Sequence, residues 1–136
     1  MNPLFHDIFQ KTRLLSKELN LVLKKYDLFA AQWTVLFCIH QHGEMTLTQI
    51  WKYLNVEAPT ITRTVNRLEK LGWLTMHEGK DRREKIVRLS EDTNTKFPEI
   101  KSAIIRFENE FLEGLSDEEQ VQLSALLNKM DKEGRV

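Results

Sequence analysis

The first fifth of the chain carries hydrophobic residues at the spacing of an α-helix. They recur every three or four positions from Leu4 to Tyr26, and Pro3 stands where proline favours the start of a helix. This pattern predicts one helix of about six turns. An apolar stripe of that length needs a partner, which is either the rest of the chain or a second copy of it.

Three shorter helical segments follow before residue 72. The first covers about residues 29–42. The second opens on Thr46, whose hydroxyl forms a capping box pattern with Gln49 three residues later. The third has Pro59 in its first turn and stops before Gly72. The sequence therefore predicts a helix and then two short helices that are joined by a tight connection.

The pattern then changes to two short extended segments, 73–76 and 86–89, on either side of the polar stretch 77–85. Such a pair of segments is typical of a β-hairpin with a long loop. Two further helical segments follow, one behind Ser90 and one behind Ser116, each with acidic residues in its first turn. The fold class expected is mainly α, with a small β-hairpin.

The length and composition fit a globular protein of one domain, or of a small domain with a dimerisation extension. The chain has 136 residues, of which 41% are hydrophobic and 29% charged. Its longest apolar run, Val35–Ile39, is far shorter than the roughly 20 residues that cross a membrane, so no membrane partner is expected. The N-terminus lacks the layout of a signal peptide, and a single cysteine, Cys38, excludes an internal disulfide. We therefore expect a cytoplasmic protein.

The net charge of zero hides an uneven distribution. Residues 56–90 carry eight Lys and Arg against five Asp and Glu, whereas residues 91–136 carry six against eleven. A basic centre is a weak indication of a polyanionic partner.

Two short helices and a following hairpin form a winged helix-turn-helix, in which the second helix enters the major groove of DNA and the hairpin reaches a neighbouring groove. Opposite the apolar positions of the third short helix stand threonines, Asn66 and basic side chains, and Glu69 is the only acid between Ala58 and Leu71. Arginine matches the edge of guanine and asparagine that of adenine, while threonine hydroxyls suit phosphate. These residue types predict a face that reads double-stranded DNA.

We expect twelve residues to contact DNA. They are Thr46 and Thr48 of the first helix of the motif, Thr60, Thr62, Arg63, Asn66, Arg67 and Lys70 of the second, and Lys80, Asp81, Arg82 and Arg83 of the hairpin loop. An arginine at the loop tip suits a narrow minor groove. Because phosphate repels Asp81, we expect Asp81 to hold Arg83 or Arg82 in position through a charge-assisted bond.

At these residues the chain resembles the MarR family. Residues 56–74 closely resemble the recognition helix of that family, 81–83 with 87–90 look like its Asp-x-Arg wing, and 32–36 match its second-helix motif. The resemblance spans about Leu15 to Met130. It implies an obligate homodimer whose first and last helices interlock on a pseudo-palindromic operator. It also implies a repressor that a small ligand, often phenolic, or an oxidant releases from DNA.

With this resemblance the expected division is a dimerisation helix over 1–28, a winged helix-turn-helix DNA-binding domain over 29–90, and dimerisation helices over 91–136.

Three positions depart from the family pattern. Phe29 stands where a capping Thr or Ser is usual, so the cap must come from elsewhere, with Asp27 as a candidate. Glu57 replaces a common serine before the recognition helix, and Asp92-Thr93 replaces a frequent Lys-Gly pair.

The resemblance places a ligand pocket between the dimerisation helices and the winged domain. His6, Tyr26, Trp33 and Phe37 are the residues that we expect to line it, although each also fits a core position. The chemical nature of a small-molecule effector does not follow from these residues.

Other chemistry is disfavoured. Cys38 lies in an apolar segment without a nearby Lys or Arg to lower its pKa, which argues against a redox role. His40, His42 and Glu44 lie close together but lack the further ligands that zinc needs, so we expect no metal and no cofactor. The sequence contains no glycine-rich phosphate loop and no set of nucleophile and base, so we expect no enzymatic activity. The remaining alternative is a winged helix that binds proteins without reading DNA.

Overall fold

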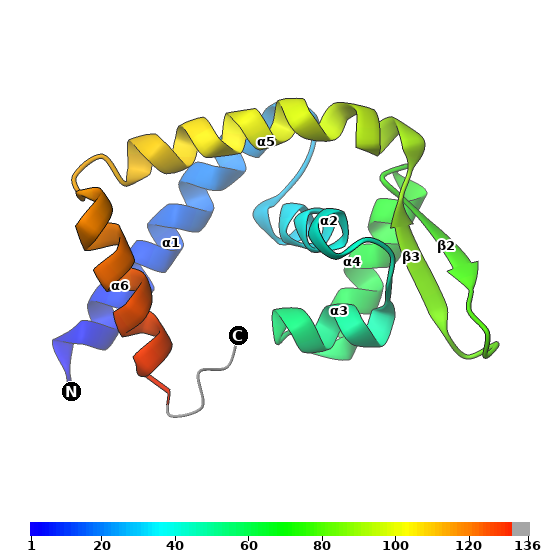
Figure 1. The fold of residues 1–136 in the computed structure, drawn as a ribbon, viewed down its shortest axis with the longest axis horizontal. Coiled ribbons are helices and arrows are strands. Elements are labelled where there is room, and N and C mark those ends of the chain that lie inside the picture. Colours follow the sequence, from blue (N-terminus) through cyan, green and yellow to red (C-terminus); the bar gives the residue numbers. More distant parts are fainter. Residues whose placement is uncertain (132–136) are drawn as a thin grey trace.

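The long helix α5 bridges two groups of elements (Figure 1). The structure is a computed structural model that describes residues 1–131. Its elements lie in the order α1 (Pro3–Leu23), η1 (Lys24–Tyr26), α2 (Ala30–His42), β1 (Met45–Thr46), α3 (Leu47–Leu54), α4 (Ala58–Lys70), β2 (Leu74–Glu78), β3 (Lys85–Leu89), α5 (Glu91–Phe111) and α6 (Asp117–Lys129). On one side, α6 lies near the N-terminal half of α1, and on the other lie α2, α3, α4 and the hairpin (Figure 1).

The expected helices and the hairpin are confirmed, and the polar residues before four of the helices explain where they start. The side chains of Asn2, Thr46, Ser90 and Ser116 each accept a hydrogen bond from a backbone N–H in the first turn of α1, α3, α5 and α6. These caps satisfy backbone groups that would otherwise lack a partner. None of the helices in the described part of the chain is long and apolar enough to cross a membrane.

The cap of α2 does not come from Asp27. The side-chain oxygen of Asn20, at the other end of the connection, accepts the N–H of Ala30 at 2.6 Å, and the Gln32 side chain accepts that of Phe29 at 2.9 Å. Asp27 instead adopts a left-handed conformation with φ of 57°, which turns the chain between η1 and α2. Phe29 can therefore occupy the N-cap position because α1 supplies the missing acceptor.

A third strand, which the sequence pattern did not predict, completes a small antiparallel sheet in the order β1-β3-β2. Met45 pairs with Val87 and Thr46 with Ile86, while β2 pairs with β3 from Leu74 to Glu78. Two residues are too few to show an alternating pattern. Glu44, just before β1, also forms an ion pair with Arg88 of β3. The base of the hairpin is thus attached to the helix-turn-helix.

The core lies between α2, α3, α4, the sheet and the first half of α5. Its fully buried side chains include Leu36, Ile50, Leu68, Val87 and Ile100. The ring of Phe97 stacks on Trp33 at a centroid distance of 5.0 Å and on His40 at 3.8 Å. Aromatic packing therefore fixes α5 against α2.

The other side of the molecule leaves hydrophobic surface uncovered. No residue of α6 is buried, and Leu23 is the only buried residue of α1. A groove of about 470 Å³ between α1, α5 and α6 has mostly apolar walls, among them Leu15, Phe107, Phe111, Leu123 and Leu127. Val121 is 70% exposed and Phe9 is 59% exposed. Exposed apolar surface of this extent marks an interaction site.

Candidate nucleic-acid interface

Helix α4 has one buried and one exposed face, as the amphipathic pattern predicts. Ile61, Val65 and Leu68 are buried under it. Asn55 turns the chain between α3 and α4 with φ of 54°, and the N–H of Val56 reaches back to the Trp51 carbonyl at 3.1 Å. This tight turn presents the outer face of α4 to solvent.

The predicted DNA-reading residues of α4 all lie on that outer face. Thr60, Thr62, Arg63, Asn66, Arg67 and Lys70 are exposed. Among the described residues, no ion pair occupies Arg63, Arg67 or Lys70. The guanidinium groups are therefore available to an external acceptor.

The threonines of α4 differ in what their hydroxyl groups can still donate. The hydroxyl of Thr62 donates to the Ala58 carbonyl at 3.0 Å, within the helix itself. The Thr60 hydroxyl instead accepts from Arg63 at 3.4 Å, so its own proton remains available. Of these two side chains, Thr60 is the better placed to donate to a phosphate oxygen.

The two predicted residues of α3 lie at its N-terminus. Thr46 is half-buried, and its oxygen accepts the N–H of Gln49 at 3.1 Å, while the Gln49 side chain accepts the N–H of Thr46 at 2.9 Å. The capping box is thereby confirmed. Thr48 is exposed in the first turn. A helix N-terminus with free N–H groups favours a negatively charged group such as phosphate.

Glu57 stands at the N-cap of α4 without a side-chain capping bond, and it is exposed. Its carboxylate adds negative charge where the helix dipole would otherwise attract phosphate. The first turn of α4 is therefore less suited to bind phosphate than a serine-capped helix.

The hairpin loop folds into a compact tip. The N–H of Gly79 donates to the Glu84 carbonyl at 3.0 Å, and the N–H of Glu84 to the Asp81 carbonyl at 2.9 Å. A Cβ at position 79 would lie 2.9 Å from the Cβ of Glu84, so the closure needs a glycine. Lys80, Arg82 and Arg83 are exposed around the tip.

Asp81 contacts the backbone and not an arginine side chain. Its Oδ1 accepts the backbone N–H of Arg83 at 3.1 Å, and among the described residues no ion pair joins Asp81 to a guanidinium group. The expected charge-assisted bond is therefore not present. The aspartate side chain is short, so it hydrogen-bonds the backbone of its own turn more readily than it pairs with a mobile, exposed arginine side chain. Asp81 shapes the loop that presents Arg83.

Replacing Asp81 by alanine is expected to weaken binding to operator DNA, although it removes a negative charge. A lost exposed turn bond of about 0.5–1.5 kcal/mol corresponds to roughly two- to tenfold in affinity. Asp81→Asn is the matched control, because it keeps the accepting oxygen without the charge, and it should bind at least as well as the wild type. Fluorescence anisotropy on the operator duplex measures both variants. Tighter binding by Asp81→Ala would make the residue a repulsive charge only.

The four residues expected to line a ligand pocket do not meet within one chain. Trp33 packs on Phe97, and its ring centroid lies 6.1 Å from that of Phe37. Tyr26 lies in η1, whereas His6 is near the start of α1, roughly 30 Å away along the helix axis. Phe97 fills the space beside Trp33, which the sequence pattern alone did not reveal.

The other reactive side chains have structural partners. Cys38 is buried, its Sγ lies 3.3 Å from the Met45 Sδ, and desolvation raises the pKa of the thiol. His42 Nδ1 lies 3.0 Å from the Cys38 carbonyl oxygen. His40 stacks on Phe97, and Glu44 pairs with Arg88. No group of three potential metal ligands occurs within residues 1–131.

Comparison with known proteins assigns this fold to a family. The sequence model of the MarR family matches residues 28–85. The chain is 44% identical over 123 residues to the uncharacterized HTH-type transcriptional regulator YwoH of Bacillus subtilis (strain 168), covering 90% of each chain. A cysteine-to-serine variant of MarR from E. coli, complexed with operator DNA, matches with a TM-score of 0.88 and 26% identity over 93% of this chain and 92% of that one. Wild-type MarR from E. coli in its apo form matches with a TM-score of 0.76 and 26% identity over 95% and 96%. The chain therefore belongs to the MarR family of transcriptional regulators and has its winged helix-turn-helix fold.

Proposed function

We propose that the protein binds double-stranded DNA as a homodimer and regulates transcription from a pseudo-palindromic operator. The observation that carries this proposal is the outer face of α4, where Arg63, Asn66 and Arg67 are exposed and no ion pair with a described residue engages the arginines. An arginine or asparagine on such a helix reads base edges in the major groove. The family is one of transcriptional regulators and not of enzymes.

The uncovered apolar surface supports the homodimer. Helix α6 has no buried residue, and an isolated helix of 13 residues is marginal in water. A second copy that packs on α1, α5 and α6 would bury it. We assign dimerisation to residues 1–28 and 91–136, of which the last five lie outside the described residues, and DNA binding to residues 29–90. The two α4 helices would then contact half-sites about 34–36 Å apart.

The comparison supports DNA as the partner, because the operator-bound MarR variant from E. coli shares the fold of this chain with a TM-score of 0.88 over 93% of its length. We further propose that the protein works in the cytoplasm as a repressor that a small ligand releases, as the family resemblance implies.

Selection of bound sequences from random duplex DNA tests the proposal. Enrichment of an inverted repeat, with an affinity that falls steeply as salt rises, is the expected result. The spacing of the enriched half-sites reports the geometry of the dimer. If no sequence is enriched and binding to bulk duplex is absent at low salt, the chain is instead a winged helix that binds proteins.

A further inference from the structure

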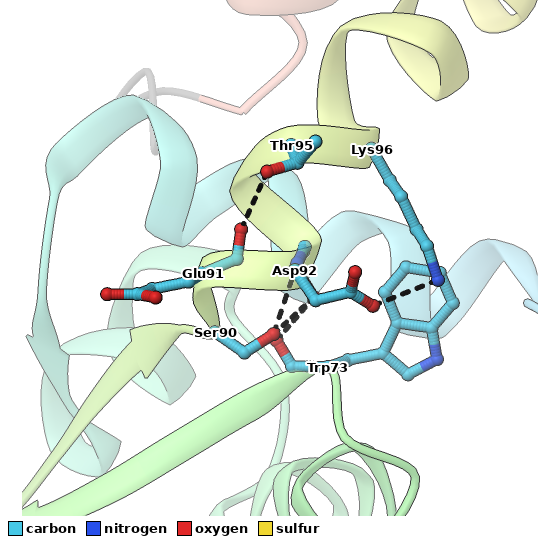
Figure 2. Close-up of polar contacts among 7 residues, drawn as sticks. Trp73, Ser90, Glu91, Asp92, Thr95 and Lys96 are labelled. Carbon is cyan, nitrogen blue, oxygen red and sulfur yellow. Dashed lines mark hydrogen bonds and ion pairs between the residues drawn. The ribbon is translucent and has the colours of Figure 1, made fainter.

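One carbonyl group, just beyond the paired strands β2 and β3, contacts the first turn of α5 close to the end of α4. The carbonyl oxygen of Trp73 accepts the backbone N–H of Ser90 at 3.1 Å and the hydroxyl of Thr93 at 2.8 Å. The Ser90 hydroxyl donates to the Thr93 hydroxyl at 2.8 Å and accepts the Thr93 N–H at 3.1 Å. Figure 2 shows Trp73 beside this first turn of α5. We call these three residues the α4–α5 joint.

The hydroxyl of Thr93 is buried, so it must keep its hydrogen-bond partners. Thr93 is only 1% exposed, and it is the one buried polar residue in the described part of the chain. A chain of hydrogen bonds from Ser90 through Thr93 to Trp73 satisfies both hydroxyl groups. Hydrogen bonds shielded from water are held more firmly than exposed ones, and leaving one partner unpaired is costly.

The carbonyl of Trp73 is itself fixed to α4. The Trp73 N–H donates to the Leu68 carbonyl at 2.9 Å, and Gly72 turns the chain with φ of +89°. Leu68 is completely buried under the outer face of α4. A displacement of the first turn of α5 relative to Trp73 would therefore displace α4 relative to α5.

The exposed contacts around the joint are weaker. Lys96 Nζ lies 5.7 Å from the centre of the Trp73 ring and 3.0 Å from Asp92 Oδ2, and both charged residues are exposed. Exposed ion pairs contribute little to the stability of a fold. The hydroxyl of Thr93 is thus the specific element.

We propose that Thr93 is a positioning residue that sets the angle between the recognition helix α4 and the dimerisation helix α5, and hence the half-site spacing that the dimer accepts. This inference rests on the proposed function. The 13 residues of α4 span about 20 Å, so a rotation of about 5° at the joint moves the far end of α4 by roughly 2 Å. That shift is enough to misplace hydrogen-bonding side chains against base edges.

Thr93→Val tests the proposal because it keeps the shape and removes the hydroxyl. Three duplexes are compared: the selected operator, the operator with one base pair added or removed between its half-sites, and a single half-site. Thr93→Ser, which keeps the hydroxyl, should behave as the wild type. Thr95→Val is the matched control, since the Thr95 hydroxyl is exposed and bonds only to Glu91 of its own helix at 3.1 Å (Figure 2).

The expected result is a loss of spacing discrimination. If the wild type prefers the correct spacing by about tenfold, Thr93→Val should prefer it by threefold or less, and its affinity for a single half-site should stay within about twofold. Thermal unfolding and sedimentation of each variant show whether it remains a folded dimer. Should Thr93→Val not fold, Thr93→Ala, which also removes the hydroxyl and suits a helix, replaces it.

Unchanged spacing discrimination in a folded Thr93→Val dimer would overturn the proposal. An equal loss on the operator and on the single half-site would do so as well, because it would show general destabilisation. If the wild type itself selects no sequence, the proposed function fails, and the role of Thr93 fails with it.

Discussion

Leu127→Glu is expected to convert the dimer into monomers and to abolish operator binding. Leu127 is 50% exposed in the single chain and lines the groove between α1, α5 and α6. A carboxylate there changes little in a monomer but would be buried without a partner in the dimer, once in each copy by symmetry. Two such penalties should raise the dimer dissociation constant by about a thousandfold or more. Sedimentation should then show a species of 16.1 kDa.

The neighbouring substitution Asn128→Glu is the control. It introduces the same carboxylate on the same helix, about 100° around the axis from Leu127 and on the side away from Leu123, the other residue of α6 that lines the groove. This variant should remain a dimer and bind the operator as the wild type does. A dimeric Leu127→Glu variant would show that α6 is not part of the interface, and the proposed division of the chain would have to change.

Arg67→Ala is expected to reduce operator affinity by about 1–3 kcal/mol, or roughly 5- to 150-fold, and to relax the base preference at one position of each half-site. Arg67 is exposed on the outer face of α4, and no described residue forms an ion pair with it. Arg63→Ala should act similarly at a different position. Arg67→Lys should not restore the preference, because lysine lacks the planar fork that contacts two acceptors of guanine.

Lys70→Ala provides the contrasting control at the end of α4. Removing a residue that contacts phosphate lowers the affinity for all DNA sequences equally. Each lost contact also reduces the magnitude of the slope of log affinity against log salt by about 0.9, which is about 2 for the two copies in a dimer. Competition assays with operator and random duplex separate the two outcomes. If Arg67→Ala behaves as Lys70→Ala should, then Arg67 binds the backbone and does not read a base.

The sequence was sufficient for the parts of the fold that depend on local pattern. The six α-helices within residues 1–131 were expected from apolar spacing and from capping residues such as Thr46 and Ser90, because these signals lie within one or two turns. The hairpin was expected because the helical spacing of apolar residues gives way after Gly72 to two short extended segments. The outer face of α4 also follows from the helical period, which places Arg63 and Arg67 opposite Val65 and Leu68.

Features that depend on distant residues were missed. The cap of α2 comes from Asn20, ten residues before Ala30, and β1 exists because it pairs with β3 forty residues later. Thr93 looked like a departure from the family pattern, and its role became visible only beside the Trp73 carbonyl. The packing of Phe97 on Trp33 likewise needed the fold, since nothing in either segment indicates the other.

The pairing of β1 with β3 means that the hairpin is not a free arm. Met45 lies opposite Val87, and the next residue caps α3, so the base of the hairpin and the helix-turn-helix share one strand. Only the segment 79–84 projects beyond the paired strands, and it is closed by the bond from Gly79 to Glu84. The loop 79–84 can therefore be replaced as a unit, separately from the paired strands. We expect that loops of other lengths and charges can be grafted between those two residues without disturbing the helix-turn-helix, because the paired strands stay unchanged.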